Sequence, residues 1–393
     1  MRFGVDATCW WSRRGFGRCT RGLLTAMFEE AAGHRFCLFV DRAPEAAMMH
    51  PNVDIVRVNP SRPVTDAAVA SGSRSLRDIW AFTRASSREP MDLMFFPAVY
   101  SWFPMRPGVP MVVTLHDAIA EHFPELVFPD RKGRIMWNMK MRLARWQASR
   151  FMTVSTAAKN EIVEHLGIKA DRIDVVNEAA DPIFHPVTDA KARAAARIRA
   201  KLPADGRFII YASGLAPHKN IAGLIDGFSN ALARGGLEDV HLALVGDPGG
   251  GGFHSNHHQL LAQVDSAPLL RGRVHFTGYV TDEDLVSLYT DALAAAVPSF
   301  SEGFGLPAIE AMACGTPVLA STAGAVPEVV GDAGLYFDPH DTMQIADAIH
   351  RIATERDTLE SLRKRALQRS AEFTWANAAR LAVGHLERAA GGA

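Results

Sequence analysis

The sequence has almost no net charge and very little cysteine. Lysine and arginine number 42 against 43 for aspartate and glutamate, so no overall field would draw the chain to nucleic acid, and any basic site must be local. The four cysteines lack the spacing of metal ligands and lie in apolar stretches, where buried free thiols are common. These shortages argue against a nucleic-acid partner and a disulfide-rich scaffold, and they favour a reducing cytoplasm.

The sequence also lacks a long hydrophobic run. No apolar stretch reaches the roughly 18 residues needed to span a bilayer, and residues 1–7 already have the pattern of a strand. We therefore expect neither a transmembrane helix nor a signal peptide, and any membrane contact should be peripheral. Apolar residues make up 48% and charged residues 22%, values typical of a globular protein, which argues against long disorder.

Two series of strand patterns divide the chain. The first contains RFGVDA, FCLFV, VDIVRV, LMFFP, MVVTL and FMTVS, and the second contains RFIIYAS, HLALVG, RVHFTG, AAAVPS and TPVLAS, with helical patterns between them. Such alternation is typical of a parallel sheet covered by helices. At 393 residues the chain is also longer than one hydrophobic core usually serves.

We therefore predict an α/β fold of two doubly wound, Rossmann-like domains. Residues 182–205 contain prolines and charges but no strand pattern, so the domains should comprise residues 1–182 and 183–374. Ligands of such sheets bind beyond the C-terminal ends of the strands, and two facing domains would place the site in a central cleft.

The most informative segment is PSFSEGFGLPAIEAMACGTPVLAS, residues 298–321. It leads from a buried-strand pattern through a glycine-bearing turn into a helix with Pro307 at the favoured first position. Gly303 and Gly305 would let backbone amides approach a ligand closely. The free N–H groups at the helix start then favour an anion such as a phosphate.

Two glutamates flank this turn. Glu302 precedes it and Glu310 lies about one turn into the helix, so both carboxylates could accept hydrogen bonds from the hydroxyls of one sugar-bearing ligand. The alternative is that Glu302 caps a helix and Glu310 is solvated. The glycines, the proline and the small-residue run 314–317 favour the ligand.

The segment resembles the donor-site signature of retaining group-one (family four) glycosyltransferases, which have the GT-B fold. The resemblance extends over nearly the whole chain. In that family the first glutamate contacts the transferred sugar and the second binds the nucleotide ribose, roles that fall on Glu302 and Glu310. The mannosyltransferase-like branch has a Pro-(Arg)-Lys-Asn element similar to residues 216–220 here, which gives Lys219 the role of neutralising the donor diphosphate.

The chain departs from the family pattern at two positions. Many members have arginines where this chain has Ser213 and His218, so diphosphate binding should depend more on Lys219 and on backbone amides. The alternative for Lys219 is a solvated lysine at a helix start.

A second segment resembles the family's base-recognition strand and helix. It is RVHFTGYVTDEDLVSLY, residues 273–289, in which backbone groups near Val280 would meet the nucleobase. Backbone contacts carry no signal of base identity, so GDP- and UDP-linked sugars both remain open. The acidic triplet 282–284 mimics a D-x-D metal site, but Thr281 three residues before Asp284 favours a helix cap. We expect neither a metal nor a cofactor.

The first half carries a glycine turn and a histidine, each after a strand pattern. Gly15 and Gly17 match the family loop that faces the donor, although a lone G-x-G is weak evidence for phosphate binding and a plain tight turn is the alternative. His116 follows the strand MVVTL, and the resemblance implicates it near the transferred sugar; alone it would be read as a structural histidine. Asp117 is expected to orient the loop.

The resemblance thus implies His116, Lys219 and Glu302 as catalytic residues. The donor-binding residues that it implies are Gly15, Gly17, Ser213, Gly214, His218, Val280, Gly303, Phe304, Gly305, Leu306 and Glu310.

A basic helix is predicted within residues 131–150. This segment has seven basic residues and no acid, interleaved with Met136, Met139, Leu143 and Trp146 at helical spacing. Such a helix could lie on an anionic membrane or meet a lipid-diphosphate acceptor. The alternative is a core-packed helix with a solvated basic face.

The resemblance implies transfer of a hexose, mannose-like, from a nucleoside diphosphate sugar to a glycan or polyprenyl-linked acceptor in cell-surface polysaccharide or lipopolysaccharide assembly. It implies a metal-independent displacement with retention, and a final helix near 375–390 that packs back on the first domain. A phosphorylase, a disaccharide synthase and a non-catalytic sugar- or lipid-binding protein are the alternatives. A nicotinamide-dependent dehydrogenase is disfavoured, because no G-x-G-x-x-G loop follows the first strand.

Overall fold

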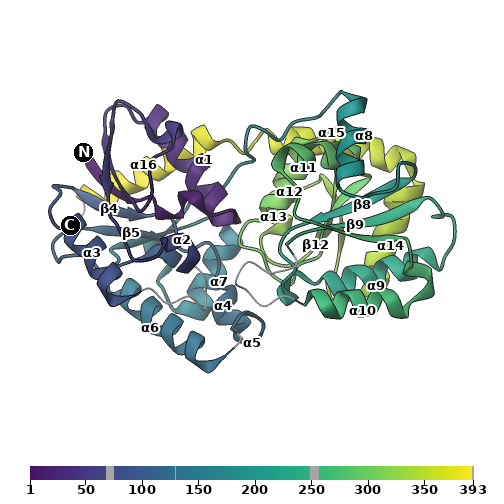
Figure 1. Cartoon of the computed structure of the whole chain (residues 1–393), viewed down its shortest axis with the longest axis horizontal. Coiled ribbons are helices and arrows are strands. Elements are labelled where there is room, and N and C mark those ends of the chain that lie inside the picture. The colour runs from purple at the N-terminus through teal and green to yellow at the C-terminus, as the bar shows by residue number, and fades with distance from the viewer. Residues whose placement is uncertain (68–74, 129, 248–255, 392–393) are drawn as a thin grey trace. The chain divides into compact units, whose positions relative to one another are not determined.

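The computed structural model describes residues 1–67, 75–128, 130–247 and 256–391. The chain forms two compact units, one made of Met1–Ala179 with Thr374–Ala393 and the other of Ala180–Phe373. Each unit holds a parallel sheet with helices on both faces (Figure 1). The predicted α/β class with two doubly wound sheets is confirmed. Among the described helices, none is both long and apolar enough to cross a bilayer.

The first unit has a seven-stranded sheet in the order β3-β2-β1-β4-β5-β6-β7, with all neighbouring strands parallel. Its strands are β1 (Arg2–Asp6), β2 (Arg35–Val40), β3 (Val53–Arg57), β4 (Leu93–Phe96), β5 (Met111–Thr114), β6 (Arg150–Thr153) and β7 (Ile173–Val175). Its helices are α1 (Gly15–Glu30), α2 (Val64–Ala67), α3 (Leu76–Ser86), α4 (Ile119–His122), α5 (Pro124–Val127), α6 (Arg131–Gln147), α7 (Thr156–Leu166) and α16 (Trp375–Gly391).

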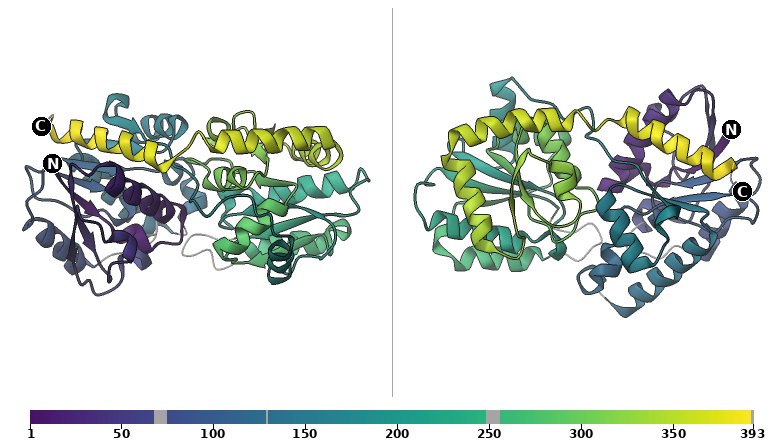
Figure 2. Two further views of the ribbon diagram at one scale, coloured as in Figure 1. Left: turned by 90° about the horizontal axis from the view of Figure 1, so that it is seen from above. Right: turned by 180° about the vertical axis from the view of Figure 1, so that it is seen from behind.

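The last helix, α16, packs on the first unit. Its small and apolar residues, Ala379, Ala382 and Leu386 among them, join the same buried core as α1, and the two helices lie side by side in both views of Figure 2. Gly22 of α1 permits this approach, since a Cβ there would lie 2.2 Å from the Trp375 ring. The chain therefore returns, after the whole of the second unit, to complete the core of the first.

The second unit has a six-stranded parallel sheet in the order β10-β9-β8-β11-β12-β13. Its strands are β8 (Arg207–Ala212), β9 (Val240–Val245), β10 (Val274–Gly278), β11 (Ala294–Val297), β12 (Val318–Ser321) and β13 (Gly334–Phe337). Its helices are α8 (Ala190–Arg199), α9 (Ile221–Leu232), α10 (His257–Ser266), α11 (Asp282–Asp291), α12 (Leu306–Ala313), α13 (Val326–Val330), α14 (Thr342–Thr354) and α15 (Arg356–Ser370).

The central strand β8 shows why this sheet is covered on both faces. Successive side chains of a strand point to opposite faces, and here both sets are apolar and buried. Ile209 and Tyr211 belong to a core with α9 and α14, whereas Phe208 and Ile210 belong to another with α11 and α12. A strand buried in this way can carry polar residues only at its ends, where the loops begin.

Candidate donor-binding site

The site lies at the point in the sheet of the second unit where the order of the strands reverses. β8 and β11 are neighbours at the centre of the sheet, and the chain proceeds from β8 to β9 on one side and from β11 to β12 on the other. In doubly wound sheets, ligands bind at this switch point, beyond the C-terminal ends of the strands. The loops that leave these two strands, residues 213–220 and 298–305, carry most of the predicted donor-site residues.

The second loop ends in a glycine that starts a helix. Gly305 has a φ of 96° and is the N-cap of α12, with Pro307 in the first turn. This backbone conformation suits glycine, and the N–H groups at the start of a helix favour an anion. Because the cap is Gly305, the alternative in which Glu302 caps the helix is wrong.

Lys219 and Glu302 form the charged centre of the site. Lys219 Nζ lies 2.8 Å from both carboxylate oxygens of Glu302, and Ser299 Oγ donates to Glu302 Oε1 at 2.7 Å. The two side chains are only 16% and 9% exposed, so the alternative of a solvated lysine is wrong. Burial raises the pKa of Glu302, but the charge and hydrogen bond of Lys219 outweigh it, and the net pKa is lowered.

Asn220 ties the two loops together. Its backbone is left-handed, with a φ of 53°, and its side-chain amide donates to the carbonyl oxygens of Pro298 at 3.1 Å and Pro339 at 2.7 Å. The backbone N–H of Phe300 in turn donates to the carbonyl of His218 at 3.0 Å. These bonds hold Lys219 opposite Glu302.

Two supports of Glu302 were not predicted from the sequence. One is Ser299, and the other is Gly324, at which a Cβ would lie 2.6 Å from the Glu302 backbone nitrogen. The next residue, Ala325, donates its N–H to the Glu302 carbonyl at 3.0 Å. The sequence shows Gly324 only as a glycine after a buried strand. That pattern does not tell which segment of the chain approaches it.

His218 stands beside this pair without adding a charge. Burial and the neighbouring Lys219 lower its pKa to about 4, so the ring is neutral near pH 7. Its buried Nδ1 has no hydrogen-bond partner among the described residues. A neutral ring at this position leaves Lys219 as the cation of the loop; that diphosphate binding depends on Lys219 stays a prediction.

Glu310 lies inside α12 rather than in solvent. Its residue is 5% exposed, so the alternative of a solvated Glu310 is wrong. Burial, with the charge of Glu310 as a further cause, raises the pKa of the nearby Cys314 thiol to about 12. Phe304 and Leu306 are also buried, and Phe304 packs edge-on against Phe373 at 5.6 Å between ring centroids. Their side chains therefore belong to the core, and their backbone borders the turn.

Other predicted donor residues of the second unit, Ser213, Gly214 and Val280, also follow the C-terminal ends of strands in this sheet. The hydroxyl of Tyr211 donates to the Gly214 carbonyl at 2.6 Å, which shapes the loop that starts at Ser213. Val280 lies between β10 and α11, just before Thr281. The helix cap predicted there is confirmed, since the Thr281 side chain accepts from the Asp284 N–H, and the Asp284 carboxylate pairs with Arg199 at 2.5 Å.

In the first unit, Gly15 and Gly17 begin α1. A Cβ at Gly17 would lie 2.1 Å from the Ser12 carbonyl oxygen, and Arg21 donates to that oxygen at 2.9 Å. The turn is thus a close backbone approach, and a role in donor binding stays a prediction. His116 lies just beyond β5, and Asp117 accepts from the Ile119 N–H at 3.0 Å, orienting the loop as expected.

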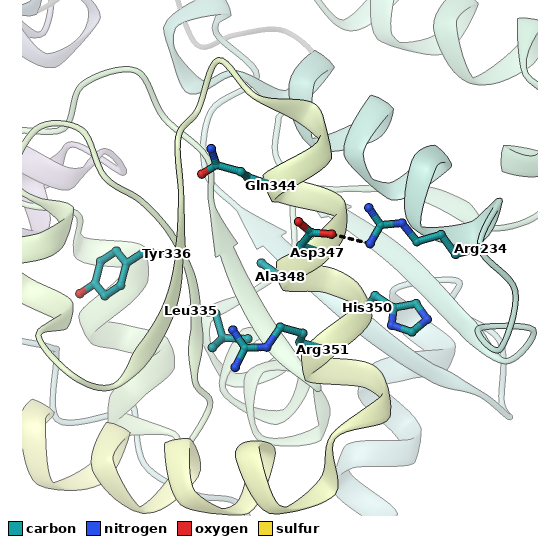
Figure 3. Close-up of a pocket in the computed structure, with 8 residues that line it drawn as sticks. All are labelled: Arg234, Leu335, Tyr336, Gln344, Asp347, Ala348, His350 and Arg351. Atoms are coloured by element: carbon teal, nitrogen blue, oxygen red, sulfur yellow. Dashed lines mark hydrogen bonds and ion pairs between the residues drawn. The ribbon is translucent and has the colours of Figure 1, made fainter.

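A separate pocket of the second unit lies at its edge strand (Figure 3). It is lined by Arg234 after α9, Leu335 and Tyr336 of β13, and residues of α14. Arg234 pairs there with Asp347 at 2.5 Å. None of the predicted donor-site residues is among the described residues that line it. Arg351, which also lines it, pairs with Glu355 of the same helical segment at 3.3 Å.

Comparison with known proteins agrees with this geometry. The family model described as Glycosyl transferases group 1 matches residues 193–369, and that of Glycosyltransferase Family 4 matches residues 14–183. Serotype-specific mannosyltransferase WbdA of Escherichia coli is 28% identical over 394 residues, 94% of this chain but only 46% of WbdA. The chain therefore spans less than half the length of that relative.

Two further relatives complete the comparison. O-antigen chain mannosyltransferase B of Escherichia coli is 32% identical over 266 residues, which cover 68% of this chain and 67% of that protein. The sucrose-phosphate synthase structure from Thermosynechococcus elongatus superposes with a TM-score of 0.73 at 22% identity, over 99% of this chain and 98% of that one. This likeness shows the GT-B fold. With the two family matches and the paired lysine and glutamate at the switch point, the chain belongs to the group-one glycosyltransferases, within their mannosyltransferase-like branch.

Proposed function

We propose that the protein transfers a hexose, mannose-like, with retention, from a nucleoside diphosphate sugar to a glycan or polyprenyl-linked acceptor in the assembly of O-antigen or a related cell-surface polysaccharide. The observation that carries the proposal is the Lys219–Glu302 pair at the switch point of the sheet, beside the start of α12. The mannosyltransferases WbdA and O-antigen chain mannosyltransferase B support the choice of sugar and pathway.

The proposed reaction needs no side-chain nucleophile. Lys219 and the N–H groups at the start of α12 stabilise the charge that develops on the leaving diphosphate. Glu302, already oriented by Ser299, accepts hydrogen bonds from sugar hydroxyls and fixes the sugar against the acceptor. The departing phosphate oxygen takes the proton of the acceptor hydroxyl, and no metal takes part.

Thermal unfolding with nucleotides tests this assignment. GDP, UDP, ADP and their sugar conjugates would be added with and without magnesium to wild type and to Lys219→Ala and Glu310→Gln. A ligand that binds only the folded state raises the midpoint temperature of unfolding. At a ligand concentration of about 100 Kd, it adds about 2.7 kcal/mol to the free energy of unfolding. We expect a metal-independent shift with one nucleoside diphosphate, and its loss in both variants.

The matched control is Lys364→Ala, which removes an exposed lysine from α15. This variant should shift as wild type does. A shift that needs magnesium, or one that both site variants retain, would contradict the proposed site. Binding without any transfer or donor hydrolysis would favour a non-catalytic sugar-binding protein, and transfer to free phosphate would favour a phosphorylase.

We also propose that the protein acts in the cytoplasm and touches the inner face of the membrane through α6. The buried side of this helix is formed by Trp137, Met141 and Ala144. Its other side exposes Ile135, Met139, Leu143 and Trp146, at 66%, 58%, 47% and 78%. The alternative that these residues pack in the core is therefore wrong for Met139, Leu143 and Trp146.

The chemistry of this helix favours a lipid surface. The exposed apolar residues recur every three or four positions, which places them on one face. Arg131, Lys132, Arg134 and Arg142 are exposed beside them, and the helix contains no acidic residue. An apolar stripe bordered by basic side chains is the pattern of helices that lie in the interface of anionic membranes.

A further inference from the structure

Three segments of the first unit meet in a buried cluster that the proposed reaction has not yet used. Cys19 comes from α1, His116 from the loop after β5, and Glu178 from the chain that follows β7 and leads to the second unit. Their thiol, imidazole and carboxylate atoms all lie within 4.8 Å of one another. Cys19 and Glu178 are each 4% exposed, and the His116 side chain is 11% exposed.

The hydrogen-bond partners of His116 define where its protons lie. Nε2 is 3.0 Å from the Pro97 carbonyl oxygen, which can only accept. Nδ1 is 3.2 Å from Glu178 Oε1. Beside an ionised Glu178, both ring nitrogens face acceptors, and both hydrogen bonds form only if the ring carries two protons.

Charge supports the same assignment. Burial lowers the pKa of His116, but the hydrogen bond and charge of Glu178, with smaller contributions from the Pro97 carbonyl and Asp117, outweigh it, and the net pKa is raised. Burial and the charge of Glu178 raise the pKa of Cys19 well above its usual value, so this group is a thiol and donates to the carboxylate. Glu178 thus accepts from two sides and is held in place.

We propose that Glu178 is a positioning residue of the transfer reaction: it holds His116 in one orientation as a doubly protonated ring at the C-terminal end of β5, and Cys19 fixes the carboxylate that does so. This inference rests on the proposed function in one respect, namely the role near the transferred sugar that the family resemblance implies for His116. There a fixed cation stabilises negative charge as the diphosphate leaves.

Histidine NMR of the full chain tests the protonation directly. His116 is assigned by the signal lost in His116→Gln, and its titration is compared in wild type and Glu178→Gln. The amide of the variant has nearly the same shape and can pair with a neutral ring. We expect His116 to titrate above the ordinary value of 6.5 in wild type and at lower pH in the variant. Titration at or below 6.5 in wild type would overturn the proposal without any variant.

The kinetic test is the pH profile of kcat/KM. We expect the ratio of variant to wild type to fall as the pH rises, by about tenfold for each unit by which the two His116 pKa values differ, because the variant loses the ring's charge at a lower pH. A purely structural role would lower activity equally at each pH, and parallel profiles would overturn the proposal. Stoichiometric zinc in the purified protein, lost in Glu178→Gln, would also overturn it, since the three side chains would then be metal ligands.

The chain offers a matched control. Glu387→Gln removes the carboxylate of another histidine pair, 3.1 Å from His34, and should leave the His116 titration and the kcat/KM profile unchanged. If wild type shows no turnover but His116 still titrates above 6.5, the proposed function is wrong, whereas the hydrogen-bonded arrangement of His116 and Glu178 is retained. The two failures can therefore be told apart.

Discussion

At the scale of single residues, the donor site is built around a pair that is neutral as a whole. A lysine and a glutamate of this low exposure are tolerable because each compensates the other, and removal of one leaves the other without a partner. In the proposed reaction, a diphosphate would bring negative charge to Lys219, and sugar hydroxyls would bring donors to Glu302. The two hydrogen bonds between them therefore hold both side chains in place at the candidate site.

His218 gives a prediction for stability. Its pKa is about 4 in the folded protein against 6.5 for the ordinary group, so the unfolded chain binds the proton more tightly. The stability from the neutral buried ring is fully present above about pH 6.5 and is lost as the pH falls toward about 4. The shift corresponds to about 3.5 kcal/mol at most, at about 1.4 kcal/mol per pKa unit.

The measurement is urea unfolding followed by circular dichroism, at intervals of pH between about 4 and about 7. His218→Gln keeps a polar side chain but has no group that titrates there. We expect wild type to lose stability relative to this variant as the pH falls. A constant difference between the two proteins over this range would show that the ring is not buried as a neutral group.

At the scale of elements, α6 carries the prediction for membrane contact. Trp146 and Ile135 are exposed, so their replacement by serine should leave the fold intact and remove apolar area from the interface. Cosedimentation with vesicles of phosphatidylglycerol and of phosphatidylcholine measures the binding. We expect wild type to bind the anionic vesicles, more weakly at high salt, and Ile135→Ser/Trp146→Ser to bind several-fold less.

The matched control is Leu381→Ser on α16. It also replaces an exposed apolar side chain, 48% accessible, but outside α6. Its vesicle binding should equal that of wild type. Transfer to a water-soluble acceptor should be the same in all three proteins, because none of the changed residues belongs to the donor site. Equal vesicle binding by the double variant and wild type would contradict the role of α6.

At the scale of the whole molecule, the two units can be observed separately. Each has its own buried core, and every tryptophan of the sequence falls in the first unit. The seven are Trp10, Trp11, Trp80, Trp102, Trp137, Trp146 and Trp375. Tryptophan fluorescence therefore reports the first unit alone, whereas circular dichroism reports both.

This separation predicts how nucleotide acts on unfolding. Because the proposed base, ribose and diphosphate contacts come mainly from the second unit, a bound nucleoside diphosphate should stabilise that unit and raise its urea midpoint in circular dichroism. The fluorescence midpoint should move much less. Lys219→Ala should abolish the shift in circular dichroism and leave the fluorescence curve unchanged. Equal shifts of both signals would mean that the two units unfold as one.

Most of the fold could be predicted from the sequence, and the two strands that were missed share a position. β7 and β13 lie at the edges of their sheets, are three and four residues long, and are only partly buried. An edge strand has a neighbour on one side only and needs no continuous apolar run. The other two edge strands, β3 and β10, are no more buried, but each is five residues long and was recognised.

The sequence by itself determined the elements, the two sheets and the residue types of the donor loop, because strand burial, glycine turns and helix starts depend on neighbours along the chain. Only the tertiary structure decided which distant groups face each other. It brought Lys219 to Glu302 across 83 positions, and Glu178 to His116 between β7 and β5. Such pairs depend on the order of the strands in a sheet, and that order cannot be predicted from the pattern of residues within one segment.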